Sequence, residues 1–484
     1  MKISYNWLKW YVPEIPEASE LADLITYHLA EVETIENLVL LPDENVSDWI
    51  LDIKILPNRA HDLLSHHGIA HELSSLLNIA YNDPVPKYKV PQLQPTNLKI
   101  EVDSDKCRRY MGRIIRNIKV GPSPDWVVKH LESIGQRSIN NIVDAANLTM
   151  YDCGQPTHVF DLNKVQEGLV IRQAKDGEAL TTLDNKECKF KTSDLVIADA
   201  ERALAVAGVK GGKLAEVEDN TTDIILEVAN FDPVSVRKTA QSLNIFTDAR
   251  KRFENDLSPE LASQGMLELS ALIAEMCPEA TFEEIVDVYP QKPAERKLKF
   301  RIEKIISILG MLVSVEEVKE ILDRYKISFE EKEGVFEIVV PAMRLDLNIE
   351  EDMAEEIGRI LGYDKVKANI PKISFQPVQN AIYQKISEVR EKFLNEGYSE
   401  VMTYVFRDKG KVSVLASASD KKFLRTNLAD GLTESLKLNK TNLPLLGLKE
   451  VKIFEIGTVW TPEEEIHVAY NEKNNIIEKN LNEY

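Results

Sequence analysis

Apolar residues recur at helical spacing in some parts of this chain and form short strand-like runs in others. From Leu21 to Leu29 the apolar positions repeat every three or four residues, which predicts an amphipathic helix that Ser19 would cap. Runs of apolar and β-branched residues predict strands at Leu98–Val102, Leu169–Ile171, Ile224–Val228, Val335–Val340 and Val451–Ile456. This mixture indicates an α+β protein.

Proline-rich intervals at residues 83–95 and 290–293 favour extended linkers, because proline removes a donor and restricts the backbone. The 484 residues are also too many for a single hydrophobic core. We therefore predict a multidomain chain. Its segments are 1–90, a small helix–strand module; 91–292, a β-rich domain; 293–370, a second helix–strand module; and 371–484, which opens with an amphipathic helix and ends in strands.

Composition is that of a soluble globular protein, with 44% hydrophobic and 29% charged residues. The longest uncharged apolar stretches are strand-sized, and the first residues lack the features of a signal peptide. We expect no membrane span and a cytoplasmic location.

The four cysteines are widely spaced without a C-x-x-C pair, so no zinc site or disulfide framework is indicated.

The net charge of −20 argues against a large surface for a polyanion on this chain, and no DNA binding is expected. Basic residues do gather at Arg108–Arg116 and at Arg250–Arg252. Either group could contact phosphates, and either could equally be solvated surface charge.

Acidic residues crowd the stretch Arg344–Glu356. If Asn348 caps a helix here, Asp352 lies three and four positions before Glu355 and Glu356 on one face, where the carboxylates repel one another. A hard cation such as Mg²⁺ would relieve that repulsion. The alternative is that acids in a first turn favour the helix dipole and stay solvated.

A second set of polar residues and glycines falls in the β-rich domain. Its pieces are Gly135–Ile139, Asn141–Asn147, Gly154–Asp161, Gly208–Gly212, Glu227 and Thr247–Glu254. Glycines permit close backbone approach, and histidine, glutamate and arginine can read polar groups, so a small-molecule pocket is plausible. His158 taken alone is more often a structural residue than a catalytic one.

Four histidines, His61, His66, His67 and His71, lie close together in the first module. Two of them have the i, i+4 spacing that can bind zinc on a helix. No cysteine or third ligand stands at motif spacing, so we expect core or surface histidines.

Both sets resemble the β subunit of a bacterial phenylalanyl-tRNA synthetase. Further matching stretches are Leu56–Ala60, Ile357–Tyr363, Gly397–Tyr404, Leu424–Leu428 and Phe454–Gly457. The resemblance implies a B1-like module at 1–90, a B3/B4-like editing domain at 91–292, a B5-like module at 293–370 and a truncated, non-catalytic class II synthetase-like sheet domain at 371–484. It also implies that two tRNA-binding domains of longer members are absent: an oligonucleotide-binding fold, because Val39–Asp43 runs almost directly to Trp49, and the anticodon-binding domain at the end.

The resemblance implies a phenylalanine–tRNA ligase that charges tRNA(Phe) with ATP as an α₂β₂ heterotetramer, with no aminoacylation residues in this chain. A Mg²⁺ shared with the α subunit would be held by Asp346, Asp352, Glu355 and Glu356. Editing would hydrolyse Tyr-tRNA(Phe), since a second site that demands the hydroxyl sharpens a limited discrimination. The implied editing pocket comprises Arg137, His158, Gly208, Gly212, Glu227, Thr247 and Ala249.

This sequence departs from the family pattern at Lys210, where an apolar residue is more usual, and at Arg250-Lys251, where a small residue often comes first. Two alternatives stay open: a non-enzymatic scaffold subunit with a decayed editing pocket, and a free-standing tRNA deacylase. The retained acidic stretch and class II-like end argue against the second, because deacylation alone needs neither.

Overall fold

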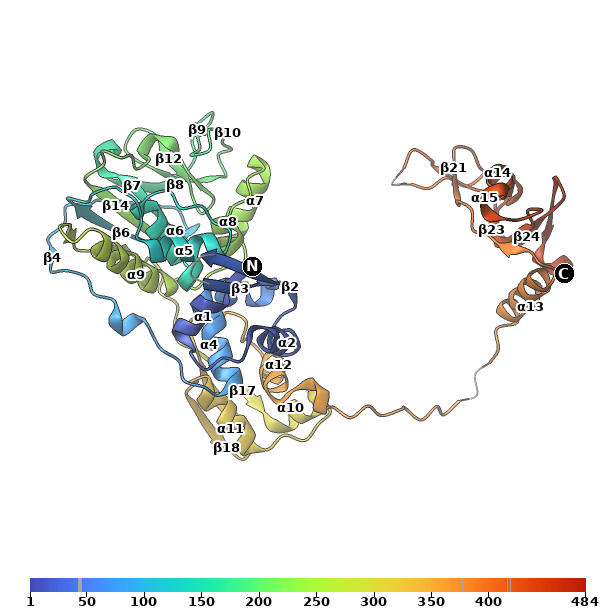
Figure 1. Ribbon diagram of the computed structural model, residues 1–484, viewed down its shortest axis with the longest axis horizontal. Coiled ribbons are helices and arrows are strands. Elements are labelled where there is room, and N and C mark those ends of the chain that lie inside the picture. The colour runs from blue at the N-terminus through green and yellow to red at the C-terminus, as the bar shows by residue number, and fades with distance from the viewer. Residues whose placement is uncertain (42–45, 376–377, 416, 418) are drawn as a thin grey trace. The chain divides into compact units, whose positions relative to one another are not determined.

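The computed structural model divides into two compact units, Met1–Ala368 and Asn369–Tyr484 (Figure 1). It describes residues 1–41, 46–375, 378–415, 417 and 419–484. The predicted direct connection from Val39–Asp43 to Trp49 falls partly outside the described residues.

The first module is a three-stranded antiparallel sheet with helices packed on it, in the strand order β1-β3-β2. Its elements are β1 (Lys2–Ser4), α1 (Tyr5–Tyr11), α2 (Ala18–His28), β2 (Val32–Leu41), β3 (Val46–Ile53), α3 (Ala60–Leu63) and α4 (His66–Leu77). Ser4 caps α1, since its hydroxyl accepts from the Trp7 N–H at 3.0 Å. Ser19 does not cap α2: that helix already begins at Ala18, with Glu17 at the cap position.

The central domain holds a six-stranded sheet and a five-stranded sheet. The first has the order β4-β15-β6-β14-β7 with β16 also on β6, and the second β13-β12-β11-β8-β5. The strands are β4 (Leu93–Gln94), β5 (Ile100–Asp103), β6 (Cys107–Arg116), β7 (Thr157–Asp161), β8 (Leu169–Gln173), β9 (Ala179–Thr181), β10 (Glu187–Lys189), β11 (Leu195–Ala198), β12 (Ala203–Val206), β13 (Lys210–Gly211), β14 (Ile224–Phe231), β15 (Thr281–Glu283) and β16 (Val286–Val288). The helices are α5 (Asp125–Ser133), α6 (Asn141–Cys153), α7 (Pro233–Leu243), α8 (Asp248–Phe253) and α9 (Leu261–Met276).

All eight residues of β14 are buried, because both faces of its sheet are covered. Side chains alternate along a strand. Ile224, Leu226 and Val228 pack with residues of α6 and α9, whereas Ile225 and Ala229 pack with residues of the five-stranded sheet. Glu227 falls between Ile225 and Ala229 in this alternation. Its carboxyl is therefore placed between the two sheets.

The second helix–strand module is a three-stranded sheet, β17-β19-β18, with three helices. Its elements are β17 (Arg296–Arg301), α10 (Ile302–Leu309), α11 (Val315–Arg324), β18 (Phe329–Lys332), β19 (Val335–Val340) and α12 (Glu350–Leu361). Asn348 does not cap α12 as expected; its amide donates to the carbonyls of Leu345 and Asp346. Asp352 satisfies the helix start instead, since its carboxylate accepts from the N–H groups of Asn348 and Ile349 at 2.7 and 2.9 Å.

The second unit contains a four-stranded sheet, β20-β23-β24-β25, and the short pair β21-β22. Its elements are α13 (Ala381–Asn395), β20 (Ser399–Glu400), β21 (Phe406–Arg407), β22 (Phe423–Leu424), α14 (Ala429–Thr441), α15 (Leu443–Leu446), β23 (Ile453–Trp460), β24 (Glu464–Glu472) and β25 (Asn475–Asn480). Arg425 and Glu455 form a buried ion pair at 2.6 Å in this unit.

Short 3-10 helices complete the two units at Pro57–Arg59, Val85–Lys87, Leu162–Lys164, Lys213–Ala215, Tyr363–Lys365 and Leu481–Glu483. The predicted α+β class is confirmed, and each predicted strand overlaps an observed one. The boundaries placed at residues 90, 292 and 370 stay predictions. Among the described residues, none of the helices combines the length and apolarity that a bilayer crossing requires.

Candidate functional site

A cavity of about 380 Å³ opens where α6, α8 and the edges of the two central sheets meet. That volume lies in the range of small-molecule sites. Five of the predicted pocket residues line it: His158, Gly208, Glu227, Thr247 and Ala249. His158 belongs to β7 and Glu227 to β14, Gly208 lies in the turn that follows β12, and Thr247 and Ala249 lie at the start of α8. Residues up to about ninety positions apart in sequence therefore form one wall of the cavity.

Glu227 and His158 form the polar centre of this wall. They are directly opposed on the antiparallel pair β14 and β7, so both side chains leave the sheet on the same face. Glu227 Oε2 and His158 Nε2 are both buried and have no hydrogen-bond partner among the described residues. Because buried polar atoms are rarely left unsatisfied, a polar ligand is the natural partner for this pair.

Burial shifts both groups toward their neutral forms. It raises the pKa of Glu227 from 4.5 to about 8 and lowers the pKa of His158 from 6.5 to about 4. Near neutral pH the wall therefore presents a protonated carboxyl, which can donate and accept, beside a neutral imidazole. The His158 ring is fixed edge-on against Phe160, with 4.6 Å between centroids.

Two glycines in the cavity lining let the backbone approach neighbouring side chains closely. Gly208 has φ +68°, and a Cβ there would lie 2.8 Å from Val236 Cγ2. A Cβ on Gly211 would lie 2.8 Å from His158 Nε2, inside van der Waals contact. Gly211 was not among the predicted residues, although the glycine-rich stretch that contains it was.

Thr247 and Ala249 stand at the start of α8. The Thr247 hydroxyl donates to the Val209 carbonyl at 2.9 Å and accepts from the Arg250 N–H at 3.0 Å, so its hydrogen-bonding capacity is used in the fold. Tyr151 and Asp248, which sequence reasoning missed as site residues, also line the cavity. The Tyr151 hydroxyl donates to the Asp248 carboxylate at 2.8 Å.

Two predicted pocket residues lie outside the wall. Arg137 is exposed on the turn after α5, and its neighbour Gln136 lines the cavity instead. Gly212 packs against β12, where its N–H donates to the Leu204 carbonyl at 2.9 Å. The unusual Lys210 does line the cavity, and its ammonium pairs with Asp184 at 3.3 Å.

The acidic stretch lies in a buried network of opposite charges. Asp346 accepts from Arg344 at 3.0 and 2.7 Å, and Glu356 accepts from Arg344 at 3.0 Å and from Arg359 at 2.6 Å. Arg59 of the first module reaches Glu356 at 3.4 Å and also pairs with Glu72 at 2.7 Å. Burial alone would raise the pKa of Glu356, but the three arginines hold it below its usual range.

The four carboxylates expected to bind Mg²⁺ do not converge. Asp346 and Glu356 face guanidinium groups, Asp352 is used at the start of α12, and Glu355 is exposed on the helix surface. Among the described residues no group of three or more potential ligands is placed to hold a metal ion. This structure therefore does not fit a site made by all four, because Mg²⁺ needs oxygen ligands that arginines here already occupy. The charges of Asp346 and Glu356 are balanced by arginines in this structure.

The four histidines make packing and hydrogen-bonding contacts within the fold. His66 is fully buried, and the His61 Nε2 lies 3.1 Å from Asp346 Oδ1. His67 and His71 both lie on α4 and contact the ring of Tyr81, at centroid distances of 5.7 and 5.6 Å.

Four of the seven basic residues in the two stretches are buried, whereas Arg108 is half-buried and Arg116 and Lys251 are exposed. The buried ones are Arg109, Arg113, Arg250 and Arg252. Arg109 pairs with Asp287 at 2.7 Å and Arg250 with Glu254 at 2.9 Å, whereas Arg113 donates to a hydroxyl oxygen and Arg252 to a backbone carbonyl. Sequence spacing gave no sign of the contacts of Arg109, Arg113 and Arg252, because their partners Asp287, Ser270 and Leu64 lie far away along the chain.

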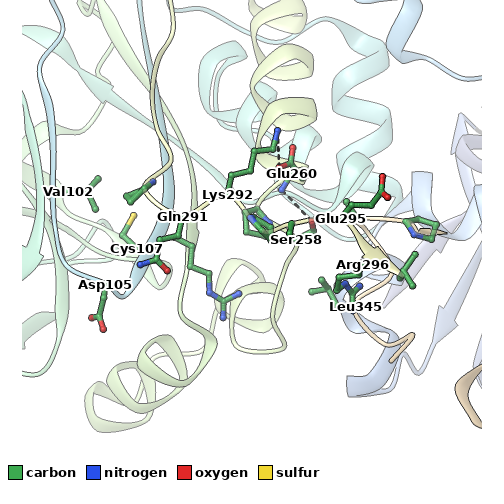
Figure 2. Close-up of a pocket in the computed structure, with 18 of the residues that line it drawn as sticks. Val102, Asp105, Cys107, Ser258, Glu260, Gln291, Lys292, Glu295, Arg296 and Leu345 are labelled. Carbon is green, nitrogen blue, oxygen red and sulfur yellow. Dashed lines mark hydrogen bonds and ion pairs between the residues drawn. The ribbon is translucent and has the colours of Figure 1, made fainter. Parts of the chain in front are cut away.

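A larger cleft, of about 1240 Å³, lies apart from Glu227 between the start of β6, the loop before α9 and residues 290–296 (Figure 2). Its charged side chains are partly paired with each other or with nearby acids: Lys292 with Glu260 at 3.8 Å, and Arg108 with Asp256 at 2.7 Å. The smaller cavity holds the two unsatisfied atoms from directly opposed residues, Glu227 Oε2 and His158 Nε2, and we take it as the candidate site.

Three family models match this chain: the B3/4 domain at residues 106–278, the tRNA synthetase B5 domain at 298–363, and the phenylalanyl tRNA synthetase beta chain CLM domain at 366–477. The candidate cavity falls in the first of these matches. The fold and the matches together define a multidomain chain of the aminoacyl-tRNA synthetase class.

Comparison with individual relatives identifies the family within this class. The chain is 36% identical to the phenylalanine–tRNA ligase beta subunit of Fusobacterium nucleatum, over 77% of this chain and 49% of the relative. It is 34% identical to that of Clostridium acetobutylicum, over 90% and 58%. A solved N-terminal fragment of the phenylalanyl-tRNA synthetase beta subunit from Pyrococcus horikoshii has 14% identity and a TM-score of 0.43, over 75% of this chain and 99% of that one. The chain belongs to the family of phenylalanine–tRNA ligase β subunits and spans about half the length of the curated relatives it matches.

Proposed function

We propose that this chain acts as a phenylalanine–tRNA ligase β subunit whose cavity hydrolyses tyrosine wrongly attached to tRNA(Phe). The observation that carries the proposal is the opposed pair of buried, unsatisfied polar atoms on Glu227 and His158. Tyrosine differs from phenylalanine by one hydroxyl, and a site whose buried polar groups need a hydroxyl rejects a ligand that lacks it.

In this proposal the protonated Glu227 carboxyl exchanges hydrogen bonds with the tyrosine hydroxyl, while apolar neighbours such as Phe253 and Ala249 enclose the ring. The neutral His158 imidazole accepts a hydrogen bond, which suits it to orient a water beside the ester. Water then attacks the ester carbon, and the tRNA ribose oxygen leaves with a proton, giving free tyrosine and tRNA(Phe). Catalysis of this kind depends on placing the water and holding the ester, and needs no covalent nucleophile.

The test is deacylation of Tyr-tRNA(Phe) by the wild-type chain and by Glu227→Ala, with Phe-tRNA(Phe) as the second substrate. We expect wild type to release tyrosine faster than phenylalanine and Glu227→Ala to lose that preference. If wild type and variant are equally inert on both, hydrolysis at this site is refuted.

The same proposal assigns the chain an α-subunit partner in an α₂β₂ heterotetramer in the cytoplasm, where the α subunit charges tRNA(Phe) with phenylalanine and ATP. The α subunit would provide the Mg²⁺-dependent chemistry, since the four predicted carboxylates of this chain do not form a joint site. The names and domains of the relatives support this role over a decayed scaffold or a free-standing deacylase.

Co-purification with a candidate α subunit, followed by mass measurement of the complex, tests the partnership. Aminoacylation by the complex without any deacylation would favour the scaffold alternative. A monomeric chain active on Tyr-tRNA(Phe) would favour the free-standing deacylase.

A further inference from the structure

The C-terminal end of α6 has two neighbours. On one side, Tyr151 lines the candidate cavity. On the other, the carboxylate of Asp152 accepts from Trp7 Nε1 at 2.9 Å and from the Tyr11 hydroxyl at 2.5 Å. Both donors belong to α1 of the N-terminal module, so that module directly holds an element of the cavity wall.

His66 makes a second link from the N-terminal module to the same helix end. The Ser4 N–H donates to His66 Nε2 at 3.1 Å, so this nitrogen is the acceptor and Nδ1 carries the hydrogen. His66 Nδ1 therefore donates to the Tyr151 carbonyl at 2.9 Å. Burial lowers the pKa of His66 to about 3, which keeps the imidazole neutral in this role, and the Trp7 indole stacks on it at 3.8 Å.

Arg252 makes the third link and joins three elements at once. Its side chain is 1% exposed, and its Nε and Nη2 donate to the Leu64 carbonyl of the N-terminal module at 3.1 and 2.7 Å. Its Nη1 donates to the Asp248 carbonyl at 3.1 Å, and the guanidinium lies 5.0 Å from the Tyr151 ring centre. Tyr151 and Asp248, which bond to each other, both line the cavity.

A gain in folding stability does not explain why a buried arginine stands at position 252. The carboxylate within ion-pair distance, Asp248 Oδ1, is 3.8 Å away and half exposed, so the buried charge is balanced mainly by carbonyl oxygens and a ring face. Burying a charge without a close counter-ion is unfavourable, and an apolar side chain would fill the space without that desolvation. What the guanidinium provides is directional: its fork fixes Leu64 relative to Asp248 and Tyr151.

We propose that Arg252 is a positioning residue that makes the N-terminal module part of the candidate site, so that docking of residues 64–66 sets the placement of Tyr151 and Asp248 in the cavity wall. The role in hydrolysis rests on the proposed function, whereas the coupling between module and wall does not.

The kinetic test compares Arg252→Met, Arg252→Lys and the control Arg113→Met in the full chain. Arg113 is equally buried in the same domain, donates to Ser270 Oγ at 2.8 Å and does not line the cavity. With Tyr-tRNA(Phe), Arg252→Met should lower kcat about tenfold or more with KM changed less than about twofold, because misplacing a wall by about 1 Å is costly while most tRNA contacts remain.

Arg252→Lys should recover part of kcat, since an ammonium can still donate to the Leu64 carbonyl. Arg113→Met should keep the wild-type kcat. Wild-type kcat in Arg252→Met, or an equal loss in Arg113→Met, would overturn the proposal.

Hydrogen exchange tests the coupling between the N-terminal module and the cavity wall without measuring activity. Backbone amides of residues 62–66 and of 247–253 should both exchange faster in Arg252→Met and stay as in wild type in Arg113→Met. If both segments are unchanged in Arg252→Met, the coupling is wrong even where deacylation is present. If the wild-type chain hydrolyses nothing, the proposed function fails, and this exchange pattern still decides the coupling.

Discussion

Glu227 and His158 face each other across β14 and β7, and burial moves their pKa values in opposite directions, to about 8 and about 4. Both shifts favour the neutral form, so near neutral pH the pair carries no charge into a space between two sheets. A neutral acid beside a neutral base can bind an uncharged hydroxyl and a water without displacing a counter-ion. Each of the two pKa shifts also makes the free energy of unfolding depend on pH.

The first prediction concerns Glu227→Gln and stability. The folded-state pKa is above the ordinary value, so the folded protein holds this proton more tightly, and wild-type stability falls as pH rises from about 4.5 to about 8. Glutamine removes that loss. The advantage of the variant over wild type should therefore grow across this window, by up to several kcal/mol at about 1.4 kcal/mol per unit of pKa shift. Urea unfolding at pH 5 and pH 8 measures it.

The matched control for that experiment is His158→Asn, whose effect should have the opposite sign. The folded-state pKa of His158 is depressed, so its contribution to wild-type stability is present above about 6.5 and lost as pH falls toward about 4. The stability of His158→Asn relative to wild type should therefore rise only as the pH falls below about 6.5. A pH-independent difference for Glu227→Gln would mean that its carboxyl is ionised in the folded chain.

The second prediction concerns Gly211→Ala. The added Cβ would overlap the imidazole of His158, which must then move from its place opposite Glu227. We expect kcat/KM on Tyr-tRNA(Phe) to fall about tenfold or more, as a displaced catalytic group typically causes. Gly121→Ala is the control, because nothing lies within 4 Å of a Cβ at that position. Equal activity of the two variants would show that the position of His158 is unimportant.

Sequence reasoning located this site through local signals and missed what depends on distant contacts. Glu227 was identified from the sequence as a polar group that could read a ligand, and the glycines around Gly208 as sites of close backbone approach. The buried role of Arg252 was not readable, because its partner Leu64 lies 188 residues away. Sequence reasoning also missed that Arg59 reaches Glu356 in the acidic stretch, because the two residues lie 297 positions apart.

The third prediction tests that acidic stretch by stability. Glu356→Gln leaves three buried guanidinium groups short of a counter-ion, and breaking a buried network of this kind costs about 3–5 kcal/mol. Glu355→Gln, one residue away on the exposed face of α12, should change stability by less than about 0.5 kcal/mol. Thermal unfolding of both variants of the isolated chain measures the difference.

Magnesium provides the companion measurement for the same residues. Because arginines already balance Asp346 and Glu356, adding Mg²⁺ or a chelator should leave the Tm of the isolated chain unchanged. A rise in Tm with Mg²⁺ that Glu356→Gln abolishes would restore the four-carboxylate metal site and contradict the ion-pair interpretation.

The fourth prediction concerns the second unit. Arg425 donates to Glu455 at 2.6 Å and to the Thr458 carbonyl at 2.8 Å, with both charged side chains at most 5% exposed. Arg425→Met leaves the Glu455 carboxylate buried and without this partner, so we expect a loss of about 3–5 kcal/mol in the stability of residues 399–460.

Arg390→Met is the control, because the 2.7 Å ion pair between Arg390 and Glu400 is at the surface and is worth about 1 kcal/mol or less. Hydrogen exchange within residues 369–484 should rise strongly in the first variant and little in the second, whereas equal exchange in both would show that the buried pair does not stabilise this unit.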